Sequence, residues 1–238
     1  MVTDVLAMMD SETRRASERA TGNFTPTFLR LNDGQKAKIR PLFNLSQCVV
    51  LAMHSKFNQV DPKQSVNAVC GTENGGECLH CDAAKAGDKK LNASTVFFLP
   101  VYVSTVEQKN ESGIWVPVTY QKDGTDFEVS GLRILELKAF GTIGTVLQFL
   151  RSLYQEDKEH DIRQYGLIVE RIGAGQSTKY TILPKGPTPM PDTAKALIPT
   201  QDAVRQMVMT ACPPAGTTVV PAAVATSSSK VSERDNDF

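Results

Sequence analysis

The stretch Thr95–Val106 has the sequence TVFFLPVYVSTV and is the strongest strand signal in the chain. β-Branched and aromatic residues dominate it, and such residues suit a pleated, half-buried surface. Pro100 interrupts the run and predicts a sheet edge or a bulge, because proline cannot donate to a strand ladder. The stretch therefore predicts a protein organised around a β-sheet.

Shorter strand patterns lie on both sides of this stretch. In Gln35–Leu42 the cations Lys36, Lys38 and Arg40 alternate with apolar residues. A strand places alternate side chains on opposite faces, so the three cations should share one face, as a solvated surface or a phosphate-binding one. Further strands are predicted at Phe28–Leu31, Cys48–Met53, Ile114–Tyr120, Leu132–Lys138, Tyr165–Ile172 and Thr178–Leu183.

A single helix is predicted between the later strands. Apolar residues recur every three or four positions from Ile143 to Tyr154, and Thr142 is a candidate N-cap. A five-stranded barrel with its helix between the third and fourth strands is the OB arrangement. We therefore expect a mainly β protein: an OB-fold barrel with hairpin elaborations, one core helix, a metal-binding loop and a disordered C-terminal tail.

Composition divides the chain into four segments. Prolines after Leu183 mark a linker, and the last residues are too poor in large apolar side chains to fold alone. We expect a flexible arm at 1–27, the OB domain at 28–187 with its metal loop at about 58–92, a linker with a short helix at 188–212, and a disordered, weakly acidic tail at 213–238.

Charge and hydropathy limit the possible partners. The 238 residues carry no net charge, but residues 28–105 hold nine Lys and Arg against six Asp and Glu. No apolar run approaches the roughly 18 residues of a membrane span. The N-terminus has no basic region or cleavage site of an export signal. We therefore expect a protein that is not secreted, does not contact membranes and has a modest positive excess in one region.

Three of the five cysteines form a cluster, Cys70-x7-Cys78-x2-Cys81. Two thiolates separated by two residues can bind one zinc ion from a tight turn, and a third Cys with one His completes a tetrahedron. The fourth ligand is expected to be His54, at the end of a predicted strand, with His80 as the alternative. A redox Cys-x-x-Cys and cysteines without a shared role are the alternatives, although no βαβ setting for a redox motif is present. A four-ligand zinc ion would be structural and would close a loop that has little core of its own.

Cations and aromatic residues on the predicted strands suggest binding of single-stranded nucleic acid, in which cations follow the backbone and bases stack on rings. The alternatives are core packing for each aromatic residue and a solvated surface for the lysines. The candidates are Lys36, Lys38, Arg40, Lys56, Phe57, Lys85, Lys89, Lys90, Phe98, Tyr102, Trp115 and Tyr120.

Motifs of catalysis were not found in the sequence. The chain contains no nucleophile elbow, phosphate-binding glycine loop or HExxH motif. Its acidic run, Glu156 to Asp161, suits a solvated loop better than a metallonuclease site. We therefore expect a binding protein and not an enzyme.

Several segments, in their order along the chain, resemble the single-stranded-DNA-binding, helix-destabilising proteins of tailed bacteriophages, the zinc-containing type included. The resemblance runs from about Phe28 to Leu183. The segments are FLRLNDGQKAKIRPL, CGTENGGECLHC, STVFFLPVYV, GLRILELK with the helix after it, and YGLIVERIGAGQSTKYTILP.

The resemblance implies an OB fold, a zinc ion held by His54, Cys70, Cys78 and Cys81, and sequence-independent binding of single-stranded DNA in replication, recombination and repair. It also implies a location in the cytoplasm of an infected bacterial host and self-association on DNA. Proteins of this function often end in an acidic segment that binds replication and recombination proteins, and Asp235, Asp237 and Phe238 are similar to such an end. The alternative function is a zinc-stabilised protein-interaction module that does not bind nucleic acid.

Overall fold

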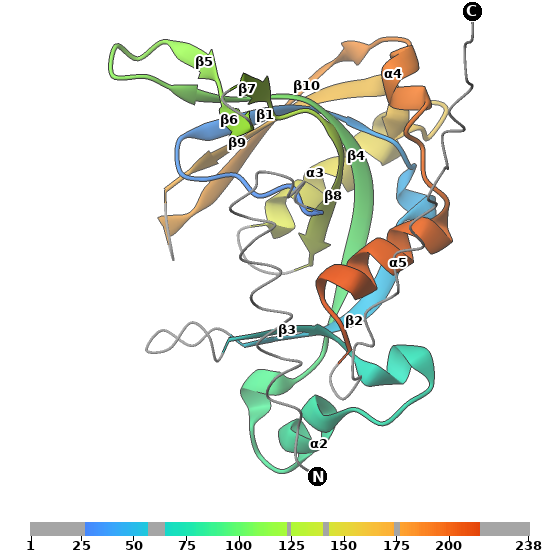
Figure 1. Ribbon diagram of the computed structural model, residues 1–238. Coiled ribbons are helices and arrows are strands. Elements are labelled where there is room, and N and C mark those ends of the chain that lie inside the picture. The colour runs from blue at the N-terminus through green and yellow to red at the C-terminus, as the bar shows by residue number, and fades with distance from the viewer. Residues whose placement is uncertain (1–26, 57–64, 123–124, 140–142, 174–176, 215–238) are drawn as a thin grey trace, which may run out of the picture.

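The computed structural model describes residues 27–56, 65–122, 125–139, 143–173 and 177–214 (Figure 1). Its main feature is an antiparallel sheet of 8 strands in the order β10-β9-β1-β4-β2-β3, with β5 and β8 also paired to β4. The mainly β prediction is confirmed. The strands are β1 (Gln35–Pro41), β2 (Val49–Lys56), β3 (Val66–Val69), β4 (Ser94–Lys109), β5 (Trp115–Pro117), β8 (Gly131–Lys138), β9 (Tyr165–Ile172) and β10 (Lys179–Pro187), with β6 (Thr119–Lys122) and β7 (Thr125–Glu128) in a separate pair.

The 16-residue strand β4 is the centre of the sheet. One of its edges pairs first with β2 and then with β1, and the other pairs with β8 and then with β5. Pro100 lies where the first edge changes partner, and its carbonyl accepts a hydrogen bond from Leu42 N at 2.9 Å. The expectation of an edge strand or a bulge at Pro100 is wrong, because this change of partner accommodates the proline. The register shift falls opposite Lys38 and Ile39 instead.

The sheet is open between β8 and β10, since no strand pairing joins them in the described residues. The segment 27–31 lies in this opening with a single parallel bridge from Phe28 to Ile134, so the strand predicted at Phe28–Leu31 is reduced to one bridge. Leu29 N donates to Ile134 O at 2.9 Å, and Arg171 donates to Leu31 O at 2.6 Å. The segment therefore links two strands that do not pair with each other, and the predicted closed barrel is not confirmed.

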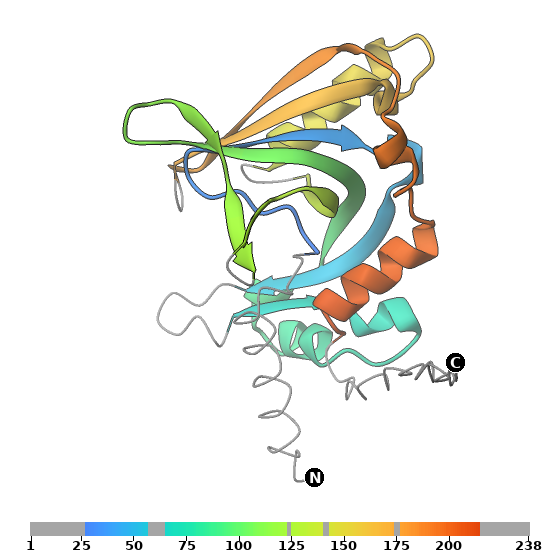
Figure 2. The ribbon, with the colours of Figure 1, turned by 45° about the horizontal axis from the view of Figure 1, so that its top comes forward.

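Helices cover the ends of the sheet. The predicted core helix is α3 (Gly144–Glu156), which contacts β8 and β10 (Figure 2). Its N-cap is Ile143, and Thr142 lies outside the described residues. In the described part of the chain no helix is long and apolar enough to cross a membrane. The other helical segments are η1 (Leu45–Gln47), η3 (Gly71–Asn74), α2 (Leu79–Lys85), η4 (Lys89–Leu91), η5 (Ile162–Gln164), α4 (Asp192–Lys195) and α5 (Gln201–Ala211).

The segment 188–212, in which a linker with a short helix was expected, contains α4 and α5. Helix α5 begins after Thr200, whose side chain accepts a hydrogen bond from Ala203 N. Val204 and Val208 on this helix are fully buried in the core. The segment therefore crosses the molecule from β10 to β2 and packs against it (Figure 1).

Candidate metal centre and nucleic-acid interface

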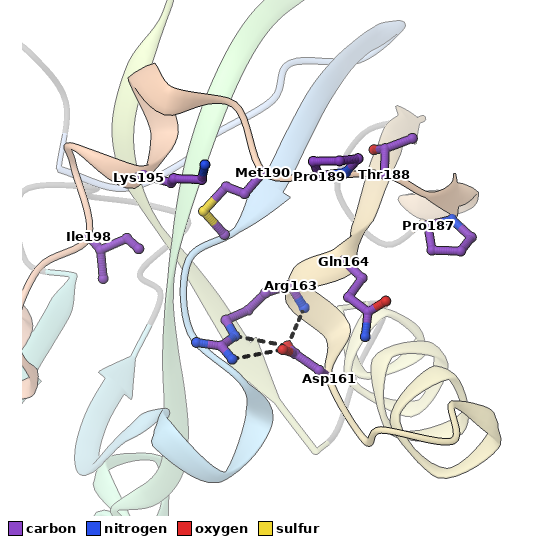
Figure 3. A pocket seen from close by; sticks show the side chains of 9 residues that line it. All are labelled: Asp161, Arg163, Gln164, Pro187, Thr188, Pro189, Met190, Lys195 and Ile198. Atoms are coloured by element: carbon purple, nitrogen blue, oxygen red, sulfur yellow. Dashed lines mark hydrogen bonds and ion pairs between the residues drawn. The ribbon is translucent and has the colours of Figure 1, made fainter.

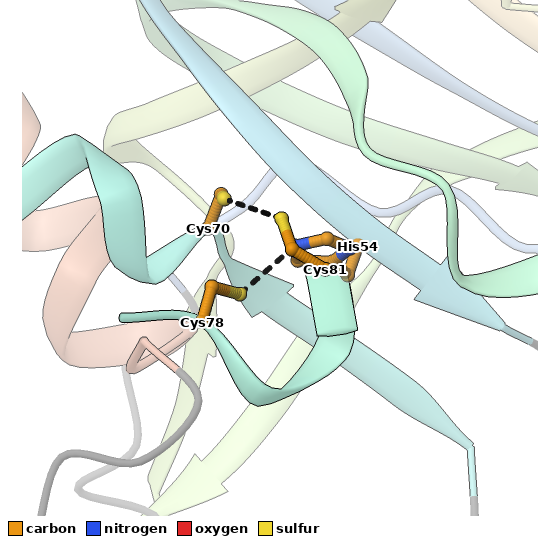
Figure 4. A group of neighbouring side chains, drawn as sticks. All are labelled: His54, Cys70, Cys78 and Cys81. Atoms are coloured by element: carbon orange, nitrogen blue, oxygen red, sulfur yellow. Dashed lines mark hydrogen bonds between the residues drawn. The ribbon is translucent and has the colours of Figure 1, made fainter. Parts of the chain in front are cut away.

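Four side chains converge where β2, β3 and α2 meet (Figure 4). His54 comes from β2, Cys70 follows β3, and Cys78 and Cys81 lie at the start of α2. Their ligand atoms all lie within 4.8 Å of one another. The distance is 3.2 Å from Cys78 Sγ to His54 Nε2, and 3.5 Å from Cys70 Sγ to Cys81 Sγ. These residues could therefore hold one metal ion.

Glycines shape the loop between the first two thiols. A Cβ atom on Gly71 would lie 2.5 Å from the carbonyl oxygen of Glu77, so a larger residue would push the two ends of the loop apart. Gly75 ends η3 with a φ of 72°, a conformation that other residues rarely adopt. The loop can therefore turn back and bring Cys78 beside Cys70.

His54 is oriented by a second contact. Its exposed fraction is 0%, and its Nδ1–H donates to the carbonyl of Leu91 at 2.6 Å. This hydrogen bond leaves the lone pair on Nε2, the atom that faces the thiols. Metal-ligating histidines usually donate their other ring nitrogen in this way, which fixes the tautomer and the ring orientation.

The thiols have unequal proton affinities. Burial alone would raise the pKa of Cys78, but backbone N–H groups of Cys81, Gly71 and His80 outweigh it and lower the pKa to about 6. For Cys81, the hydrogen bond with Cys70, together with burial and Cys78, raises the pKa to about 12. Adjacent thiolates repel each other, so the cluster keeps a proton that a divalent cation would displace.

The remaining cysteines and His80 lie outside this group. His80 packs edge-on against His54 with ring centroids 5.3 Å apart, and burial followed by the nearby His54 lowers its pKa. Cys48 and Cys212 are buried elsewhere, and burial raises their pKa values to about 12 and about 11. Of the two histidines that the sequence left open, the structure brings His54 to the three cysteines.

A second cluster lies on the outward face of β1, β4 and β5, near one end of the sheet (Figure 1). The inward residues of β1, Ala37 and Ile39, are buried, which confirms the period-two pattern of this strand. Lys36 Nζ lies 3.8 Å from the centre of the Trp115 ring, and Lys109 Nζ lies 5.2 Å from it. The ring is half-buried. An aromatic face and several cations thus meet on one surface.

The other predicted lysines lie around the metal cluster, at the opposite end of the sheet (Figure 1). Lys56 forms an ion pair with Asp88 at 2.5 Å, and Lys85 forms one with Asp82 at 3.4 Å. Lys89 and Lys90 are exposed on η4. The predicted nucleic-acid residues therefore form two groups and not one continuous track.

Arg40 does not share the open surface of Lys36 and Lys38. It is 8% exposed and donates to the carbonyls of Arg163 and Thr188, each at 3.1 Å. The expectation that Arg40 contacts phosphates is therefore corrected. Residues far along the chain cover this end of β1, and the guanidinium satisfies their backbone carbonyls.

Arg163 and Thr188, whose carbonyls accept hydrogen bonds from Arg40, line a groove of about 490 Å³ (Figure 3). Arg163 donates to both carboxylate oxygens of Asp161 within the groove, at 2.8 and 2.7 Å. This groove has no signal in the sequence, because its walls come from η5 and from the segment after β10.

The prediction that Phe98 stacks on a base is also corrected. Its exposed fraction is 0%, and its ring packs against Phe28 with centroids 6.2 Å apart. Tyr102, two pleats further along β4, is half-buried beside Arg40 and Leu132. Phe57, Asp235, Asp237, Phe238 and the side chain of Tyr120 lie outside the described part of the structure.

Several residues of the two clusters were missed in the sequence. Glu107 forms ion pairs with Lys36 and Lys38. Glu73, inside the metal loop, pairs with Arg205 of α5 at 3.1 Å. Lys109 was detectable, because a hairpin turn near Gly113 places it opposite Trp115. The two glutamates carry no local signal, since their partners come from other elements.

Comparisons with known proteins do not identify a relative. No protein-family model matches the chain, no curated protein matches its sequence, and no solved structure matches its fold.

Proposed function

We propose that this protein binds single-stranded DNA without sequence preference, in DNA replication, recombination and repair, and that it is not an enzyme. The observation that carries the proposal is that Trp115 contacts Lys36 and Lys109 on the outward face of β1, β4 and β5, with Lys38 two residues beyond Lys36 on β1. Bases of any sequence have a flat face for stacking, and phosphates need only cations. A single strand would supply both a base to stack on Trp115 and phosphates to contact the lysines.

The strand order supports an OB-like reading of the fold. The pairings run β8-β4-β1-β9-β10, and α3 lies between β8 and β9 in sequence. These are the neighbours expected in an OB barrel, with the segment 27–31 in place of the closing ladder. OB folds bind oligonucleotides on the face of their second and third strands, and β4, the second strand of this order, carries Lys109 of the proposed surface.

We further propose that the metal is zinc. The donor set of three thiolates and one imidazole suits zinc, whose bonds of about 2.3 Å to sulfur and about 2.0–2.1 Å to nitrogen place tetrahedral ligands roughly 3.5–3.8 Å apart. Three of the separations between ligand atoms, 3.2 to 3.6 Å, are close to this geometry, and all of them lie within 4.8 Å. With four protein ligands, the ion would have a structural role: it would join α2 to the sheet.

The test is fluorescence anisotropy of a labelled thirty-base oligo-dT, with a duplex of equal length as the comparison, in low and moderate salt. We expect tight binding to the single strand, much weaker binding to the duplex, and a loss of affinity with added salt, because cations are released from the phosphates. No binding in low salt would rule out the proposed function. A zinc-stabilised protein-interaction module would then be the better reading.

Replacing Trp115 by alanine should weaken oligo-dT binding by about 1–3 kcal/mol, because one stacking platform is lost. The neighbouring Ile114 is 62% exposed, so Ile114→Ala is a matched control that should bind like the wild type. Anisotropy titrations of both variants at one salt concentration measure the difference. Wild-type affinity for Trp115→Ala would give Trp115 a purely structural role.

A further inference from the structure

An acidic residue, Glu107, lies among the lysines of the surface around Trp115. We call this surface, formed by Lys36, Lys38, Lys109 and Trp115, the cationic surface. The Glu107 carboxylate contacts Lys36 Nζ at 3.0 Å through one oxygen and the Lys38 ammonium through the other. The Glu107 side chain is only 14% exposed, and Lys36 is 17% exposed. The hydrogen bond from Lys38 lowers the pKa of Glu107 against the effect of burial, and Lys36 lowers it further. The carboxylate therefore remains ionised between the two lysines.

This arrangement resembles the way that a phosphate group would be held. Two ammonium groups, two residues apart on the same face of one strand, contact the two oxygens of one anion. Lys36 also lies against the Trp115 ring, so the anion and the aromatic ring share a cation. A phosphate that approached Lys36 and Lys38 would meet a site already filled by a carboxylate of this chain.

We propose that Glu107 competes with the DNA backbone for Lys36 and Lys38. Its carboxylate occupies the position of a phosphate on these two lysines until a single strand displaces it. The inference rests on the proposed function. In the free protein the carboxylate holds both lysines in place and neutralises one of their charges. On binding, a phosphate takes over the lysines while a base stacks at Trp115. Glu107 thus lowers affinity for DNA and limits the number of counterions released.

The test compares Glu107→Gln with the wild type in oligo-dT titrations over a range of salt concentrations. The variant keeps the shape of the side chain and removes its charge. We expect roughly three- to tenfold tighter binding at low salt, with a slope of log K against log salt that is steeper by about 0.7, the value of one additional phosphate contact on a single strand. Glu111→Gln, at the exposed tip of the same hairpin, makes the same change in net charge and should have a much smaller effect.

A double-mutant cycle locates the effect. In a Lys36→Met/Lys38→Met background, Glu107→Gln should no longer tighten binding, because the lysines that it releases are gone. Unchanged or weaker binding by Glu107→Gln, or an equal gain in Glu111→Gln, would overturn the inference while leaving the proposed function intact. Failure of the wild type to bind oligo-dT would remove the proposed function itself.

A measurement on the wild type covers the case in which Glu107→Gln does not fold. Carboxyl-carbon NMR can follow the titration of Glu107 with and without oligo-dT. Displacement by phosphate separates the carboxylate from both lysines, so the pKa of Glu107 should rise toward its ordinary value when DNA binds. A pKa that stays lowered in the complex would show that the ion pairs persist, and the inference would fail.

Discussion

Replacing Cys78 and Cys81 together by serine should release the proposed zinc ion and lower the melting temperature by about 8–16 °C. An ion present at about 1,000 times its dissociation constant stabilises the folded state by about 4 kcal/mol, and each kcal/mol shifts the midpoint by about 2–4 °C in a chain of this size. The loss is expected to be this large because α2 has no fully buried side chain of its own. Its attachment to β2 depends on the cluster.

Elemental analysis and a thermal melt of the purified proteins measure both parts of this prediction. Cys48→Ser is the matched control, since it makes the same atomic change at a buried thiol outside the cluster. The control should retain the metal. If Cys78→Ser/Cys81→Ser retained the metal at the wild-type ratio, the assignment of these two ligands would be wrong.

Replacing Phe98 by alanine should destabilise the protein by about 3–5 kcal/mol, because a fully buried aromatic ring leaves a cavity that the core fills only in part. Phe98 lies on the central strand and packs against Phe28, whose segment links β8 to β9. The loss of packing should therefore also loosen the segment of Phe28 on the open side of the sheet. Denaturant unfolding measures the loss in free energy.

Phe97→Ala is the matched control for Phe98. The two rings are neighbours on β4, but Phe97 is only partly buried, so its loss should cost clearly less. The folded fraction of Phe98→Ala should bind oligo-dT like the wild type. Wild-type stability combined with weakened binding would mean that the Phe98 ring faces the ligand and not the core.

Local patterns were sufficient to predict most strands and the three cysteines of the candidate metal site. Strands β1, β4, β8, β9 and β10 have runs of alternating or apolar residues, and each was found, although β4 and β10 extend three and four residues beyond their predicted ends. Spacing identified Cys70, Cys78 and Cys81, because two cysteines separated by two residues can bind one ion from a tight turn and a third lies nearby in sequence. Strand β3 was missed, since its four residues are too few to show a period.

The sequence by itself determined most of the strands, which face of β1 is polar, and that three cysteines lie together. Only the tertiary structure decided what covers each face and what completes each cluster. Arg40 and Lys38 follow the same pattern in sequence, yet a segment more than a hundred residues away buries Arg40 and leaves Lys38 half-exposed. In the same way, the pairing of β2 with β3 brings His54, and not His80, to the cysteines. The pairing of β1 with β4 places Glu107 opposite Lys36. Periodicity gives the direction of a side chain, but the partner that it meets depends on long-range packing.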